Sequence, residues 1–172
     1  TMGLAFDSLG NSYVLDRENR RVQKFDPEMN YILQWGMPGR RPGRFLSLEA
    51  ICIDAQDDVY VLDKVRRRVS VFSGEGRLLR EFGGRGIGRG DFLIPSALAA
   101  GPLGIYVSDK GRDDIQLFDR KGEYLGAFGG FGAGEGEFND PRGIAFDSRG
   151  HIYIVDTHNY RVQEWAYRDF VQ

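Results

Sequence analysis

The chain has 172 residues, of which 41% are hydrophobic and 28% charged, and its formal net charge is −2 at pH 7. This composition is typical of a soluble globular chain with a core and argues against disorder. No run approaches the ~18 apolar residues of a membrane span, and the first residues lack the pattern of a signal peptide. A net charge near zero argues against a globally basic nucleic-acid protein, although it leaves local basic patches open.

The single cysteine, Cys52, lies in the apolar run AICID. One cysteine excludes an internal disulfide, and its surroundings favour a buried structural thiol over a reactive one. The cellular compartment is therefore left open.

A short string recurs four times along the chain. It reads YVLD, YVLD, YVSD and YIVD and ends at Asp16, Asp63, Asp109 and Asp156, with spacings of 47, 46 and 47 residues. The same register is kept by Phe25, Phe72, Phe118 and Trp165. A period of this length suits a β-propeller blade or a helical-pair repeat.

Strand patterns decide between these two repeat types. The segments GIAFD, HIYIVD, RVQEW and EYLGAFG are rich in β-branched and aromatic residues, and DSRG, DTHN and DRKG supply turns between them. No apolar set keeps helical spacing. We therefore predict an all-β chain, a β-propeller of four-stranded antiparallel blades. The predicted blade units are residues 1–48, 49–95, 96–141 and 142–172, the last with an incomplete outer strand.

The stretch FGAGEGEFNDPRGIAFDSRGHIYIVDTHNYRVQEW closely resembles the NHL repeat family. In that family a glycine-rich loop precedes a PxGIAVD strand, which is followed by GNIYVADxxNxRIQ and an aromatic residue. The resemblance extends over essentially the whole chain in four copies and implies an NHL-type propeller. The third copy departs most, because it lacks the acidic residue after its first strand and has Asp114 where the other copies have arginine.

Three units place an aspartate at the end of the second strand and an arginine five residues later. The pairs are Asp16 and Arg21, Asp63 and Arg68, and Asp156 and Arg161. Such a pair can clamp the intervening loop through a charge-assisted hydrogen bond. In the third unit, either Arg112 substitutes for the missing arginine or the blade is looser at this edge.

The number of blades leaves a question open. NHL propellers usually have six blades, whereas this sequence holds three full units and part of a fourth. An open array leaves unpaired strand edges and an uncovered blade face. The chain could be a piece of a longer protein, a small closed ring, or a propeller completed by another copy or a partner. We expect a fragment or a self-associating part-propeller.

The sequence predicts no catalytic site, metal site or cofactor. The resemblance extends to a lyase that releases amidated peptides and binds zinc through histidines, but His151 and His158 lie at opposite ends of one predicted strand. Five strand residues at ~3.4 Å each separate them by roughly 17 Å, too far to share a metal. Asp7, Asp54 and Asp147 recur where a turn begins and are expected to accept backbone hydrogen bonds. A divalent cation bound by such carboxylates stays open.

Charge is distributed unevenly over the predicted rims. In a propeller blade, the loop after the second strand and the loop after the fourth lie on one rim. On that rim the first two units bring twelve basic residues against four acidic ones, whereas the last two units are more acidic than basic. The predicted binding face consists of Arg17, Arg20, Arg40, Arg41, Arg44, Lys64, Arg66, Arg67, Arg85 and Arg89.

This basic half-face predicts a non-enzymatic scaffold for protein–protein interaction, its partner being an acidic protein surface or another copy of the chain. The alternative is RNA or another polyanion, since clustered arginines grip phosphates. The resemblance supports this alternative, because animal proteins with a tripartite motif and an NHL propeller bind RNA through a basic face. Tyr160 is the one obvious loop aromatic for base stacking. A lyase or hydrolase comes third, and exposed arginines that only solvate the rim are the remaining interpretation.

Overall fold

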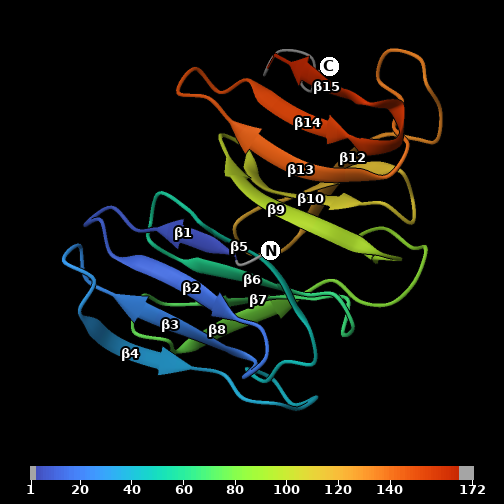
Figure 1. The fold of residues 1–172 in the computed structure, drawn as a ribbon. Coiled ribbons are helices and arrows are strands. Elements are labelled where there is room, and N and C mark those ends of the chain that lie inside the picture. The colour runs from blue at the N-terminus through green and yellow to red at the C-terminus, as the bar shows by residue number, and fades with distance from the viewer. Residues whose placement is uncertain (1–2, 167–172) are drawn as a thin grey trace. The chain divides into compact units, whose positions relative to one another are not determined.

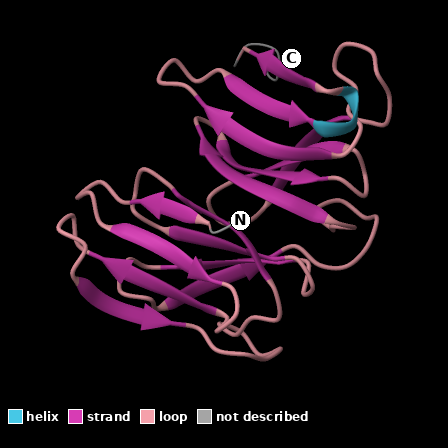
Figure 2. Cartoon of the chain, viewed as in Figure 1, coloured by secondary structure: helices cyan, strands magenta, loops and turns pink. Residues whose placement is uncertain are grey.

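The computed structural model describes residues 3–166, which form short antiparallel strands and one 3₁₀ turn, η1 (Thr157–Asn159) (Figures 1 and 2). The chain divides into two compact units, Thr1–Arg85 and Gly86–Gln172. Among the described residues, no helix is long and apolar enough to span a membrane. The predicted all-β class is confirmed.

The first unit contains two four-stranded antiparallel sheets, each with its strands in sequence order. Blade 1 consists of β1 (Leu4–Phe6), β2 (Ser12–Asp16), β3 (Arg21–Phe25) and β4 (Tyr31–Trp35). Blade 2 consists of β5 (Leu48–Ile53), β6 (Val59–Asp63), β7 (Arg68–Phe72) and β8 (Leu78–Phe82).

The second unit repeats this design. Blade 3 consists of β9 (Pro95–Gly101), β10 (Gly104–Asp109), β11 (Asp114–Phe118) and β12 (Tyr124–Gly129). Blade 4 consists of β13 (Pro141–Phe146), β14 (Ile152–Asp156) and β15 (Arg161–Trp165), which are its three strands within residues 3–166. The predicted incomplete outer strand falls on residues 167–172, outside the described part of the chain.

Alternation along the strands gives each blade two faces, and within each unit the apolar side chains of the facing sheets pack together. In the first unit, Tyr13, Leu15 and Val22 of blade 1 are fully buried and share a core cluster with Val61 and Phe72 of blade 2. We call the face of blade 1 that meets blade 2 the forward face, and use the same name for the equivalent face of the other blades. The opposite face of each sheet is its back face. Burial of these side chains supplies the main stabilisation of the blade pair.

The second unit has the same interface. Tyr106 and Ile115 on the forward face of blade 3 share a core cluster with Ile152 and Ile154 on the back face of blade 4. All four side chains are at most 1% exposed. Blade stacking thus follows one register in both units.

The glycine-rich loops close each interface with a phenylalanine. Phe45 and Phe138 are fully buried and belong to the two core clusters. Gly36, with φ +93°, begins the first of these loops, and a Cβ there would lie 2.6 Å from the Phe45 ring. The loop therefore needs glycine for both its backbone conformation and its contact. These loops connect blades, as the sequence predicts, and each leads into a strand.

Candidate functional site

Two of the three predicted loop clamps are confirmed. Arg21 Nε donates to Asp16 Oδ2 at 2.7 Å, and Arg161 Nε donates to Asp156 Oδ2 at the same distance. Asp156 is fully buried and also accepts the Asn139 backbone N–H at 2.7 Å. The clamp therefore ties the turn after the second strand to the loop that enters the blade.

The predicted clamp between Asp63 and Arg68 is wrong. Asp63 is fully buried and accepts the backbone N–H groups of Leu46, Ser47, Val65 and Arg66, whereas the Arg68 side chain is exposed. Backbone donors from two loops converge on this carboxylate, so its stabilisation requires no arginine.

Blade 3 resolves the alternative left open for its edge. Arg112 Nε donates to Asp114 Oδ2 at 2.8 Å, so Arg112 supplies the missing arginine but pairs with Asp114. Asp109 is fully buried and accepts the backbone N–H groups of Leu93 and Ile94 at 2.6 and 2.8 Å. Burial raises the pKa of Asp114, although the Arg112 guanidinium opposes this shift.

The predicted turn aspartates also have the expected role. Asp7 Oδ1 accepts the N–H groups of Leu9 and Asn11 at 3.1 and 2.9 Å. Asp54 and Asp147 accept the equivalent pairs in blades 2 and 4. These carboxylates stabilise turns at the rim opposite the clamps.

Three segments of the first unit lie together at one rim: the β2–β3 turn, the β4–β5 loop and the β6–β7 turn (Figure 1). The Lys64 N–H donates to the Ser47 carbonyl at 3.0 Å, and Arg66 Nη1 donates to the Arg44 carbonyl at 2.9 Å. The Arg17 guanidinium donates to the Glu49 carbonyl, so the first turn is also attached to blade 2. These contacts hold the three segments as one surface.

Within residues 3–166, most of the predicted basic residues of the first unit have no acidic partner, and they lie in these three segments, at the start of β7 or in the loop after β8. Arg40, Arg41, Arg68 and Arg85 are exposed, and Arg20, Arg44, Lys64 and Arg67 are partly exposed. Within residues 3–166, none of these eight side chains forms an ion pair or a hydrogen bond. We call them the basic rim.

Two residues of the predicted binding face, Arg66 and Arg17, lie beside acidic side chains. Arg66 is 8% exposed and forms a bidentate ion pair with Glu81, at 2.8 and 3.0 Å, so its assignment to an exposed face is wrong. Arg17 is 34% exposed and lies 4.0 Å from Glu49. Arg89 belongs to the second unit and is exposed there. Glu81 gave no local sequence signal, because it pairs with Arg66 across fifteen residues and from an outer strand.

Arg20 and Arg67 have left-handed backbones, with φ of 53° and 55°. Asp113 and Tyr160 occupy the equivalent turn positions and have φ of 55° and 54°. This conformation costs a residue other than glycine about 1 kcal/mol, and asparagine and aspartate tolerate it best. The basic rim therefore carries two arginines at positions where the local backbone does not favour them.

The histidines lie on either side of β14, as the sequence predicts. His151 Nδ1 is 3.1 Å from Asp147 Oδ2 and 3.3 Å from Glu164 Oε1, whereas His158 Nε2 is 3.4 Å from Asp140 Oδ2. In the part of the chain that the structure describes, no three histidine, cysteine or acidic side chains are grouped to hold a metal ion.

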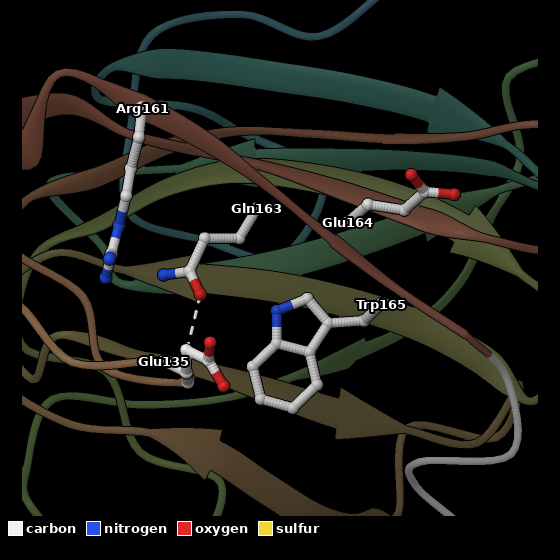
Figure 3. A pocket seen from close by; sticks show the side chains of 6 residues that line it. Glu135, Arg161, Gln163, Glu164 and Trp165 are labelled. Carbon is white, nitrogen blue, oxygen red and sulfur yellow. Dashed lines mark hydrogen bonds between the residues drawn. The ribbon is translucent and has the colours of Figure 1, made fainter.

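A cavity of about 510 Å³ lies along β15 and was not predicted from the sequence. Figure 3 shows Arg161, Gln163 and Trp165 extending from β15 towards Glu135. Arg161 is held by Asp156 and by the Gly134 carbonyl, and Gln163 accepts the Gly136 N–H at 3.1 Å. Arg161 and Gln163 thus fasten the glycine-rich loop to β15.

Comparisons with known sequences and structures show what this architecture is similar to. The profile of the NHL repeat matches residues 138–165, which contain β13 to β15. No curated protein matches the sequence.

Similar solved structures include virginiamycin B lyase from Staphylococcus aureus, at 13% identity and a TM-score of 0.65, covering 94% of this chain and 54% of that chain. Kuenenia stuttgartiensis hydrazine synthase has 16% identity and a TM-score of 0.66, with 94% and 47% covered. A protein of unknown function from Bacteroides thetaiotaomicron has 17% identity and a TM-score of 0.74, with 95% and 46% covered. The chain spans about half the length of these structures, and at such identities the likeness shows the fold alone. The chain is therefore built of β-propeller blades, the fourth of which matches the NHL repeat over residues 138–165.

Proposed function

We propose that the chain is a non-enzymatic interaction module whose basic rim binds an acidic segment of a protein partner. The observation that carries this proposal is the unequal use of charge at the rim. Asp63 is fully buried under backbone donors and Asp16 is paired with Arg21, while Arg40, Arg41 and Arg67 have no acidic partner among residues 3–166. Unneutralised basic side chains attract an acidic partner and increase its rate of association.

The apolar residues of the rim favour a protein partner over RNA. Met37 is 50% exposed and Val65 is 57% exposed, and both lie in the rim segments. The aromatic residue of these segments, Phe45, is fully buried. Single-stranded RNA is recognised largely by stacking on aromatic side chains, whereas acidic peptides commonly add aliphatic contacts to their ion pairs. RNA is therefore the second candidate.

The non-enzymatic part of the proposal is supported by the use of the polar groups. Arg161 and Gln163 line the cavity beside β15, but their polar atoms bind the backbone of the adjoining loop. A catalytic pair needs groups that can reach a substrate and change protonation during the reaction. The resemblance to a lyase is one of fold alone, so we assign no lyase activity on that basis.

The test is a binding titration with three fluorescein-labelled probes, read by anisotropy. The probes are a peptide of alternating Glu and Leu, a peptide of alternating Lys and Leu, and oligouridine RNA. The rim variant carries Arg20→Asn, Arg41→Ser and Arg67→Asn, because asparagine tolerates the left-handed backbone. The matched control carries Arg77→Ser, Lys121→Ser and Arg149→Ser, which remove the same charge from exposed turns elsewhere.

We expect the Glu–Leu peptide to bind wild type and control alike and to bind the rim variant about tenfold more weakly, since exposed charges each contribute a fraction of a kcal/mol. Binding should persist at about 0.15 M salt, where exposed pairs are screened but aliphatic contacts remain. Tighter binding of oligouridine than of the Glu–Leu peptide would indicate that the rim binds RNA and not a protein. Equal binding by the rim variant and wild type would refute the role of the rim.

A further inference from the structure

The forward face of blade 4 carries the side chains that build a blade interface elsewhere in the chain. Counting from the aspartate that ends the second strand, Tyr153, Val155 and Val162 occupy the positions of Tyr13, Leu15 and Val22. The latter three are fully buried between blades 1 and 2. In blade 4, by contrast, Val155 is 43% exposed and Val162 is 61% exposed.

The back face of blade 1 is the counterpart. Leu4, Phe6, Val14 and Phe25 occupy the positions of Ile51, Ile53, Val61 and Phe72 in blade 2. Ile51, Val61 and Phe72 are at most 8% exposed, because the forward face of blade 1 packs on them. Leu4 and Phe6 are 53% and 59% exposed.

We propose that the forward face of blade 4 docks on the back face of blade 1 of a second copy of this chain. Each copy holds one face of each kind, and the two faces have the registers that pack on one another within both units. In blade 1, Val22 lies in the same cluster as Ile51 of blade 2. By the same register, Val162 of one copy meets Leu4 of the next, and Val155 packs on the same sheet.

A second copy fits these faces better than an unrelated protein does. Clustered exposed apolar side chains on a sheet face mark an interaction site. The observed interfaces show which shape covers this face: another sheet with aliphatic residues at the positions of Ile51 and Val61, closed by an aromatic residue at the position of Phe72. Blade 1 offers Leu4, Val14 and Phe25 at those positions. The contact is heterologous, so copies associate head to tail.

This inference is independent of the basic rim, since none of the eight rim residues lies at these face positions. The mass of the full chain is measured by sedimentation velocity and light scattering over a roughly hundredfold range of concentration, because association depends on concentration. The 19.4 kDa chain should form species of twice that mass or more as concentration rises.

Two variants and one control locate the contact. Val162→Glu places a charge on the forward face of blade 4, and Leu4→Lys places one on the back face of blade 1. Both side chains are exposed within one copy, so neither change disturbs its core. Each variant alone should associate at least about tenfold more weakly than wild type, since a charge facing an apolar sheet is unpaired. Leu125→Glu, at an exposed position of β12 and outside both faces, should associate as wild type does.

Mixing the two variants gives the decisive result. In a head-to-tail contact, the mixture restores one wild-type junction, from the intact face of each variant, and sets Glu against Lys at the other. We therefore expect the mixture to associate although each variant alone does not. A wild-type chain that stays at 19.4 kDa at every concentration would overturn the proposal. Association that both variants leave unchanged, or that the mixture fails to restore, would also overturn it.

Discussion

The buried ion pair between Arg66 and Glu81 allows a specific prediction about the stability of blade 2. The two side chains are 8% and 10% exposed and share two hydrogen bonds of 2.8 and 3.0 Å. Ser70 Oγ donates a third bond to Glu81 at 2.7 Å. Glu81→Gln keeps the shape of the side chain but leaves the Arg66 charge buried without its counter-ion.

We expect this change to lower the free energy of unfolding by about 3 kcal/mol at pH 7, the lower end for breaking one partner of a buried pair, because glutamine can still accept one hydrogen bond. Replacing both partners, with Arg66→Met and Glu81→Leu, should cost much less, since no charge is then left buried. The pair would thus show a large coupling energy in a double-mutant cycle.

The loss should also depend on pH. Burial opposes ionisation of Glu81, but the hydrogen bonds from Arg66 and Ser70 outweigh it and hold the pKa of Glu81 below its usual value. Glu81 therefore stabilises the fold above the unfolded pKa, about 4.3, and this stabilisation is lost as pH falls through the lower folded value. The difference between wild type and Glu81→Gln should narrow in that range.

Urea unfolding followed by Trp35 fluorescence measures this effect in the first unit. The Trp35 ring lies 5.7 Å from Phe72 of blade 2, and Trp165→Phe removes the other tryptophan. Glu75→Gln, at an exposed turn of the same sheet, is the matched control and should change little. A loss below about 1 kcal/mol for Glu81→Gln, or a difference that does not narrow in acid, would refute the reasoning.

Three further changes test other parts of the fold. Asp156→Ala should lower the unfolding free energy of the second unit by about 3 kcal/mol, read by Trp165 fluorescence, because it removes the buried carboxylate that accepts hydrogen bonds from several partly buried donors. Arg67→Gly should raise the stability of the first unit by up to about 1 kcal/mol, because glycine adopts φ of 55° without strain; a loss in urea unfolding would contradict this. Burial raises the pKa of the Cys52 thiol, so iodoacetamide should react with it far more slowly in the native chain than in urea.

The fold could be predicted because its signals are local and repeated. Asp16, Asp63, Asp109 and Asp156 each end a second strand, and the turns between strands begin at aspartates that accept nearby N–H groups. Each of these features needs only four or five neighbouring residues, and repetition fixes the register. The forward and back faces follow from the same alternation.

The partners of the clamping residues could not be predicted so well, because they come from distant parts of the chain. Asp63 binds the Leu46 N–H, seventeen residues earlier, and Arg66 binds Glu81, fifteen residues later. A spacing of five residues between Asp63 and Arg68 is the same as in blades 1 and 4, yet the outcome differs. Competition between partners is decided by packing in three dimensions, which one repeat in isolation does not contain.

A count of charges in the sequence assumes that acidic and basic side chains are equally exposed. The structure shows that they are not. Carboxylates at strand ends, such as Asp63 and Asp109, are short acceptors that backbone N–H groups can surround, so they become buried. Arginine has donors alone and a long side chain, so at turn positions such as Arg67 it extends into solvent unless a carboxylate is nearby. In the first unit, the carboxylates of Asp16 and Asp63 are therefore used within the fold. The surface at the basic rim is consequently more basic than the count of residues indicates, except at Arg66, which is buried in its ion pair with Glu81.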